Sequence, residues 1–261
     1  MSRVTRSNLL AAIVLLLGAN AAHAKLASNK LASNKLAANK LAANKLATGG
    51  FAANPDGVSD LLATPDSREL LIYIVSCALP EGMTLVATAP DSTEYEFFGE
   101  IGLAKSWLRH PLNAAGRGWI SACLLARVNN HDVANAISFR GPHRALATVP
   151  GEAENYTLEE GAFYGDVFAT DDEGFACRGK DQAAGETGGL IDRDCAEPDP
   201  ADPTHTQCGL LYAGDCGAFA SVQACEQLSA DGFYKSCHAQ VIVAHQHSRK
   251  FRQVITVFVV P

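Results

Sequence analysis

The sequence predicts a single α+β domain that is cross-linked by disulfides and preceded by a repetitive N-terminal arm. Three observations lead to this fold class. Residues 51–261 form a segment long enough to bury one hydrophobic core. Patterns typical of helices alternate with short strand patterns and short turns, which favours antiparallel pairing. Eight cysteines, an even number, lie in this part of the chain.

The first expected helix covers residues 66–79. Asp66 and Glu69 have the spacing of a capping box, and Pro80 ends the helical pattern. Apolar residues recur at helical spacing between these limits, at Leu70, Ile74 and Cys77. One amphipathic helix is therefore predicted at the start of the domain.

A second helix is expected over residues 118–129, with Cys123 on its apolar face. Strands are expected at residues 82–88, 94–98, 133–139, 162–169 and 175–178. Residues 179–207 are rich in Asp, Gly and Pro and predict a loop. The C-terminus predicts a β-hairpin in which residues 239–244 pair with residues 253–260.

The cysteines predict four disulfides. Five of the eight fall between residues 195 and 237, so at least one of these must pair with an earlier cysteine. We expect Cys77 to pair with Cys123, because each lies on the apolar face of its helix. A zinc site is disfavoured, since no Cys-x-x-Cys pair occurs. The eight are Cys77, Cys123, Cys177, Cys195, Cys208, Cys216, Cys225 and Cys237.

Residues 1–24 have the three parts of a secretory signal peptide. Two arginines form a basic start, residues 9–17 form an apolar run, and Ala22-His23-Ala24 has the pattern of a cleavage site. The apolar run is too short to span a bilayer, which takes about 20 residues. We therefore expect the mature chain to begin at Lys25 and to be secreted, periplasmic or at the cell surface, with no transmembrane segment.

Residues 25–50 form an arm with a five-residue period, KLASN KLASN KLAAN KLAAN KLATG G. This period scatters the leucines around a helix and alternates them between the faces of a strand. The arm is therefore predicted to be a basic spacer whose removal leaves residues 51–261 folded. The start of a solenoid or an envelope-binding arm are the alternatives. Its lysines are candidates for surface attachment: Lys25, Lys30, Lys35, Lys40 and Lys45.

The charge of the chain is divided unevenly between the arm and the domain. The formal net charge is −7, but the first 50 residues hold seven basic residues and no acidic one. Residues 51–261 therefore hold 14 basic and 28 acidic residues. An acidic domain argues against nucleic-acid binding, which depends on neutralising phosphates with Lys and Arg. An anionic envelope or extracellular surface is the partner that the basic arm suggests.

Two groups of residues are candidates for chemistry. Cys123 lies near the start of a helix, where the helix dipole lowers the pKa of a thiol, so it could be a nucleophile. A structural disulfide is the alternative. His245 and His247 share one face of a strand and could bind a metal ion, or they could be polar residues at a hairpin tip. The sequence has no Gly-x-Ser-x-Gly elbow and no His-Glu-x-x-His motif, and we expect no cofactor.

Three segments of the chain, GWISACLLARVN, LEEGAFYGDVF and FACRG, resemble a recurring set of uncharacterised exported bacterial proteins. The mature starts of those proteins are also similar to the Lys-Leu-Ala-Asn repeats of this chain. The resemblance covers most of residues 66–180 and implies a bacterial envelope or extracellular setting. It implies no activity, since none is known for that set.

Two classes of function follow from these patterns. The first is an exported, disulfide-stabilised, non-catalytic domain that binds a ligand or associates with the envelope. The alternative is a secreted hydrolase that uses Cys123 or a metal held by His245 and His247. The cysteine content and the lack of a specific catalytic motif favour the first class.

Overall fold

The computed structural model describes residues 26–29, 31, 43, 46–51, 55–131, 133–169, 173–217, 224–240 and 248–261. Its centre is a six-stranded sheet in the order β1-β4-β10-β5-β6-β7. Neighbouring strands of this sheet are antiparallel, except for β6 and β7, which are parallel. The strands are β1 (Leu26–Asn29), β4 (Asn135–Arg140), β5 (Leu158–Gly165), β6 (Gly174–Arg178), β7 (Leu211–Asp215) and β10 (Val254–Val259).

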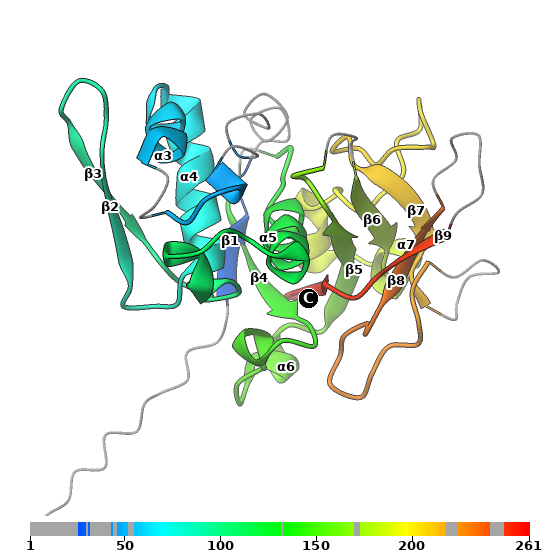
Figure 1. The fold of residues 1–261 in the computed structure, drawn as a ribbon. Helices are drawn as coiled ribbons and strands as arrows, with labels where there is room; N and C mark the ends of the chain where they lie inside the picture. The colour runs from blue at the N-terminus through cyan, green and yellow to red at the C-terminus, as the bar shows by residue number, and fades with distance from the viewer. Residues whose placement is uncertain are drawn as a thin grey trace, which may run out of the picture.

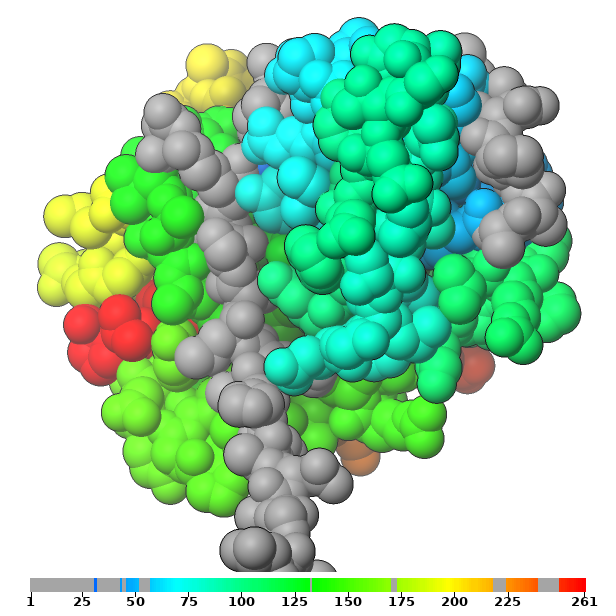
Figure 2. Space-filling model, turned by 90° about the vertical axis from the view of Figure 1, so that its left-hand side faces the viewer, coloured from blue at the N-terminus to red at the C-terminus, as the bar shows by residue number. Residues whose placement is uncertain are grey.

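Helices cover one face of the sheet (Figure 1), so the predicted α+β class is confirmed. Helix α5 packs on β5, β6 and β10, and α4 packs on α5. A two-stranded ribbon of β2 (Thr84–Thr88) and β3 (Glu94–Phe98) packs in turn on α3 and α4. Figure 2 views the molecule from this ribbon side. The helices are α3 (Pro55–Leu62), α4 (Pro65–Ala78), α5 (Ala114–Ala126), α6 (Glu152–Asn155) and α7 (Lys180–Ala183), with 3-10 turns η1 (Lys105–Leu108), η2 (Arg144–Leu146) and η3 (Gly188–Asp192).

Alternate residues of the central strands belong to two different apolar clusters. In β5, Phe163 belongs to the main core under the helices, whereas Ala162 and Tyr164 belong to a smaller cluster. This alternation follows from the two-residue period of a strand. The smaller cluster is completed by residues of the C-terminal region, among them Tyr234 and Phe251. The sheet is therefore buried on both faces at β5.

Helix α4 confirms the first predicted helix, but its cap differs from the prediction. The N-cap is Thr64, whose side chain accepts a hydrogen bond from the Ser67 backbone N–H, while the Ser67 hydroxyl oxygen accepts one from the Thr64 N–H. The predicted pairing of Asp66 with Glu69 is therefore wrong. Pro65 occupies the first helical position, where a missing N–H has no cost.

The second predicted helix begins four residues earlier than expected, at Ala114. Asn113 caps it, because its side chain accepts a hydrogen bond from the Gly116 N–H at 2.8 Å. Strand β5 is also displaced from the predicted residues 162–169. It ends at Gly165, whose φ of 142° is a conformation that favours glycine. The apolar residues that follow Gly165 lie in a turn that buries Phe168.

The C-terminal hairpin is present, but its partners differ from the prediction. Strand β8 (Cys237–Gln240) pairs with β9 (Ser248–Phe251). The segment expected to close the hairpin, residues 253–260, forms β10 instead and lies between β4 and β5. All six residues of β10 are buried. Burying both faces of this strand inside the sheet therefore stabilises the fold more than the short connection of the predicted hairpin would. Residues 241–244, part of the expected first strand of the hairpin, lie outside the described residues.

The arm differs from the spacer that its period predicted. Leu26–Asn29 form β1, the edge strand that pairs with β4, and Leu31 bridges to Val128. Leu31 and Leu46 are fully buried in the main core. The prediction failed because it tested the repeats as one continuous helix or strand, whereas the described residues of the arm contribute short pieces to a core supplied by the rest of the chain. The remaining arm residues and the predicted signal peptide lie outside the described residues.

The eight cysteines form four disulfides, as predicted, and none is free. The expected Cys77–Cys123 bond is among them and joins α4 to α5 across a Cα–Cα distance of 6.1 Å. The other three bonds lie in the C-terminal region, and one of them ties β6 to the end of β7. They are Cys177–Cys216, Cys195–Cys208 and Cys225–Cys237.

The segment 179–207 was predicted as a loop, and it also contains α7 and η3. It lies against the C-terminal residues, since the Gly189 N–H donates to the Val260 carbonyl at 2.8 Å. Figure 2 shows the same two regions side by side at the margin of the molecule. Within the described ranges, no helix combines the length and the apolar character that crossing a membrane requires.

Candidate functional site

Cys123, the predicted nucleophile candidate, is part of a disulfide and is fully buried. A nucleophile must be a thiolate that can reach a substrate. Cys123 is therefore ruled out as a nucleophile in the oxidised protein. The predicted metal ligands His245 and His247, and the five arm lysines, lie outside the described residues.

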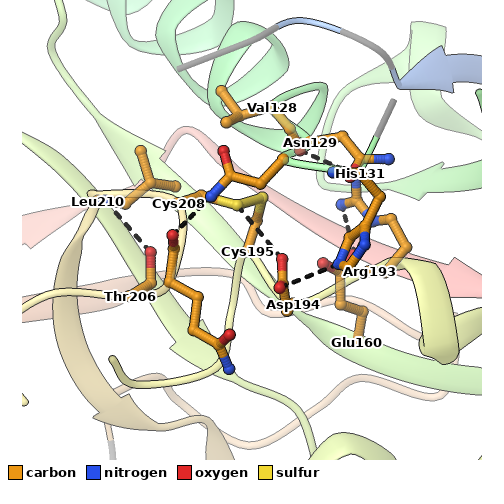
Figure 3. The surroundings of a disulfide bond; sticks show 12 residues. Val128, Asn129, His131, Glu160, Arg193, Asp194, Cys195, Thr206, Cys208 and Leu210 are labelled. Atoms are coloured by element: carbon orange, nitrogen blue, oxygen red, sulfur yellow. Dashed lines mark hydrogen bonds and ion pairs between the residues drawn. A yellow bond between two sulfur atoms is a disulfide. The ribbon is translucent and has the colours of Figure 1, made fainter. Parts of the chain in front are cut away.

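The Cys195–Cys208 disulfide lies beside a carboxylate–imidazole pair (Figure 3). Asp194 Oδ2 is 3.0 Å from His131 Nε2, and Asp194 Oδ1 is 3.6 Å from Cys208 Sγ. Both sulfurs are held in the disulfide, whereas metal ions bind thiolates. The sulfurs of Cys177, Cys216 and Cys225 also lie close together, and each of them is likewise part of a disulfide. Neither cluster is a thiolate metal site in this state.

An open groove of about 430 Å³ runs between the start of α5 and the chain that joins β9 to β10. Three of its residues are basic: Arg249, Lys250 and Arg252. Arg249 forms an ion pair with Glu173, and Lys250 forms one with Glu226. Most of the positive charge of this groove is therefore compensated by the protein itself.

A smaller and more enclosed pocket of about 260 Å³ lies where the chain leaves β4. One wall comes from residues 141–148, which include His143 and Thr148, and the other from a turn that includes Asp231 and Phe233. Apolar surface with a few converging polar groups is the usual character of a small-molecule site. This pocket is the candidate functional site.

A buried polar network positions the first wall. Arg140, the last residue of β4, donates from Nε to Ser138 Oγ at 3.1 Å and from Nη2 to the Tyr156 carbonyl at 2.6 Å. Ser138 Oγ donates in turn to Glu152 Oε1 at 2.6 Å. Glu152 Oε2 accepts from the Val149 N–H, one residue beyond the pocket. Because these groups are buried and hydrogen-bonded, they fix the path of the chain on both sides of the pocket wall.

The same arginine positions the second wall. Gly232, next to Asp231 and Phe233, has a φ of 76°, and a Cβ at this residue would lie 2.7 Å from Arg140 Nη1. The turn can therefore approach the guanidinium only with glycine at this position. Tyr234 follows the turn; its N–H donates to Thr256 Oγ1 and its hydroxyl donates to Glu159 Oε1 at 2.8 Å.

Burial raises the pKa of the Glu159 carboxyl and of the Tyr234 phenol, so desolvation favours the uncharged form of each. Arg140, Glu159 and Tyr234 support the pocket from inside the protein. The second wall is thus attached to β10 and β5, two central strands.

His143 is the half-buried polar residue of the pocket. Its Nδ1 accepts a hydrogen bond from the Ala145 N–H at 3.1 Å, which caps η2. Its ring packs edge-on against Trp119, with 5.2 Å between the ring centroids. A neutral imidazole that accepts at Nδ1 carries its proton at Nε2. A neutral His143 therefore carries its N–H donor at Nε2, and the lining also includes Asp231 and Thr148, whose side-chain oxygens can accept hydrogen bonds.

We expect His143 to titrate below its ordinary pKa. Burial lowers the pKa of this imidazole, and the nearby Arg144 charge lowers it further. The unfolded chain then takes up the proton at a higher pH than the folded chain does, so the free energy of unfolding falls as pH drops from about 6.5 towards the folded pKa. An NMR titration of the ring nitrogens, assigned with His143→Gln, measures the shift. A midpoint at or above the ordinary value would contradict the structure.

Sequence reasoning did not find this pocket. His143, Asp231 and Phe233 belong to segments far apart in the chain and to no known catalytic or ligand motif. The one local signal is the pair of turn-forming residues in each segment, Gly141-Pro142 and Asp231-Gly232. Such turns occur throughout the sequence, so this signal predicts two turns but does not predict that they lie next to each other in the fold.

No protein-family model matches the chain, and neither does any curated protein or any solved structure. The resemblance to uncharacterised exported bacterial proteins therefore stays a prediction. The argument for function rests on the residues and geometry described above.

Proposed function

We propose that this chain is an exported, disulfide-stabilised, non-catalytic domain that binds a small ligand in the pocket between His143 and Phe233. The four disulfides support export, because such bonds persist in oxidising compartments outside the cytoplasm. The signal-peptide pattern of residues 1–24 points the same way.

One observation favours binding over hydrolysis in this pocket. The pocket brings together a hydroxyl, an imidazole and a carboxylate, the groups of a hydrolytic triad, in Thr148, His143 and Asp231. In a triad, however, Nδ1–H of the histidine donates to the carboxylate. Here Nδ1 of His143 accepts from a backbone N–H instead, so the imidazole is not oriented by an acid. The same neutral imidazole is well suited to donate one hydrogen bond to a ligand.

The lining suggests the chemical class of the ligand. Phe233 and Leu146 provide an apolar surface, Nε2–H of His143 is a donor, and Asp231 and Thr148 accept hydrogen bonds. An uncharged molecule with several hydroxyl groups and one apolar face satisfies all of these, as a monosaccharide does. The volume of about 260 Å³ limits the bound part to one small unit.

The export part of the proposal is tested by expressing the full chain in a bacterial host with an oxidising periplasm. We expect the protein outside the cytoplasm, with Lys25 as its first residue and with no reactive thiol after denaturation without reductant. Terminal sequencing and a thiol assay in denaturant provide the measurements. Retention in the cytoplasm, or any free cysteine in the purified protein, would refute export with four bonds.

The binding part is tested by measuring the Tm of the protein against a panel of monosaccharides. A ligand of the pocket should raise Tm, because it binds only the folded state. Phe233→Ala should abolish the rise, whereas the matched control Phe98→Ala, at an exposed site on the β2–β3 ribbon, should keep it. An equal rise in both variants would exclude the pocket, and no rise with any sugar would reject the ligand class. Turnover of a peptide or ester by the purified protein would favour the hydrolase instead.

A further inference from the structure

The side chains around the Cys195–Cys208 disulfide include every kind of ligand that proteins use to bind Zn²⁺. The ligand atoms of Asp194, Cys195 and Cys208 all lie within 4.8 Å of one another. His131 adds an imidazole, whose Nε2 is 3.0 Å from Asp194 Oδ2 (Figure 3). In the oxidised protein the disulfide withholds both thiolates from an ion. In the reduced protein the two cysteines, the carboxylate and the imidazole make a set of four ligands.

The distances between these atoms are close to those of a tetrahedral site. With bonds of about 2.0–2.3 Å to the metal, two ligand atoms of tetrahedral zinc lie roughly 3.3–3.8 Å apart. Asp194 Oδ1 is 3.6 Å from Cys208 Sγ, which is within this range. The 3.0 Å between Asp194 Oδ2 and His131 Nε2 is slightly shorter. Small side-chain movements and the separation of the two sulfurs therefore complete the site.

The imidazole nitrogen is available to an ion. His131 Nε2 is buried and makes no hydrogen bond to any residue that the structure describes, although Asp194 Oδ2 is near. A buried polar atom without a hydrogen bond is unfavourable, and coordination of a metal ion removes this cost. The side chains of His131 and Asp194 are 37% and 23% exposed, so an ion can reach them from solvent.

Hydrogen bonds that do not involve the disulfide hold the ligand-bearing segments together. Asn130 and Gln207 each directly precede a ligand residue, and Asn130 Nδ2 donates to the Gln207 carbonyl at 2.6 Å. The Glu197 N–H donates to the Asp194 carbonyl at 2.9 Å, and the Glu197 carbonyl accepts from the Gln207 N–H at 2.9 Å. The arrangement of the ligands therefore does not depend on the S–S bond alone.

We propose that reduction of the Cys195–Cys208 disulfide creates a zinc site whose ligands are Cys195, Cys208, Asp194 and His131. An external dithiol passes two electrons and two protons to the disulfide, becomes a disulfide itself and leaves two cysteine thiols. Zn²⁺ then displaces these two protons, because it binds thiolates. Oxidation by a small disulfide reverses the change: the S–S bond forms again, the reagent takes up two electrons and two protons to become two thiols, and the ion is released.

The zinc site belongs to the reduced protein and does not depend on the ligand pocket. The lack of a Cys-x-x-Cys pair disfavoured zinc in the sequence, because that spacing places two ligands in one short loop. Here the fold brings the ligands together from three separate segments, which contribute His131, the neighbours Asp194 and Cys195, and Cys208.

The test measures metal binding after the protein has been reduced with a phosphine in denaturant, freed of the reductant and refolded without oxygen. We expect one equivalent of Zn²⁺ per chain, and a Tm about 5 °C or more above that of the reduced protein without metal. Co²⁺ as a probe should give thiolate-to-cobalt charge transfer and the strong visible bands of tetrahedral coordination. Protein refolded with its disulfides intact should show neither, and a small disulfide reagent should release the ion from the reduced protein.

Substitutions locate the ion. Cys195→Ser with Cys208→Ser should abolish the cobalt bands, and His131→Ala should weaken the affinity at least about tenfold. His205→Ala should leave the affinity unchanged; it is the matched control, because His205 lies near Cys208 in the chain but pairs with Asp202. Cobalt bands retained by the double cysteine variant would assign the ion to other cysteines and overturn the proposal. A reduced chain that binds no ion, whether folded or not, would also overturn it, as would parent affinity in His131→Ala.

Discussion

Replacing Arg193 with alanine is expected to lower the free energy of unfolding by about 3–5 kcal/mol. Arg193 and Glu160 are both fully buried, and the guanidinium binds one carboxylate oxygen twice, from Nε at 2.9 Å and from Nη2 at 2.5 Å. The substitution leaves the Glu160 carboxyl group buried and without its counter-ion, and burial alone raises the pKa of this group. Unfolding in guanidinium chloride, without reductant, measures the loss.

Arg193 also connects two parts of the fold. Its Nη1 donates to the Val128 carbonyl at 3.0 Å, and its Nη2 donates to the Ala126 carbonyl at 3.2 Å. These carbonyls lie at the C-terminal end of α5, where a positive charge is favourable. Arg193→Ala should therefore also loosen the acidic segment 179–207, which hydrogen exchange would show as faster exchange in η3.

A double variant separates the ion pair from the packing around it. In Arg193→Met with Glu160→Met, neither charge remains, and side chains of similar length fill the space. Replacing both members of a buried pair by apolar residues is often neutral, so this variant should be more stable than Arg193→Met alone. In both variants the Ala126 and Val128 carbonyls lose the Arg193 donor, so this loss cancels in the comparison. If the double variant is the less stable one, the pair does not carry the stability assigned to it.

The parts of the fold that the sequence predicted are those determined by local patterns. Helix α4, strand β3 and the Cys77–Cys123 bond follow from apolar spacing within single segments. Their boundaries were less well predicted where a cap decided them. Thr64 and Asn113 cap their helices through side-chain geometry that many other polar residues in the chain could also supply.

The pairing of distant strands could not be predicted from the same patterns. Strand β10 has the composition of a buried strand, but nothing local says that it lies between β4 and β5 and not beside β8. The arm illustrates the same limit, because Leu31 and Leu46 are buried only by surfaces that other segments provide. The pocket depends on both kinds of placement, since its two walls meet over Arg140.

Removing the Cys77–Cys123 bond is expected to be the second large effect. The bond closes a loop with a sequence separation of 46 residues. The chain-entropy model gives about 4 kcal/mol for a loop of this length, because the bond restricts the unfolded chain. Cys77→Ala with Cys123→Ala removes the bond and leaves no free thiol to exchange with the other three disulfides. Guanidinium unfolding of the oxidised variant measures the difference from the parent protein.

The Cys195–Cys208 bond provides the matched control, because it closes a loop with a separation of only 13 residues. The same model gives about 3 kcal/mol for its removal by Cys195→Ala with Cys208→Ala. All four sulfurs are buried, so the loss of packing is similar in the two double variants. The α4–α5 variant should therefore be less stable than the control by about 1 kcal/mol. If the control loses more, chain entropy does not determine the order, and the contact of Asp194 with Cys208 would be the first feature to examine.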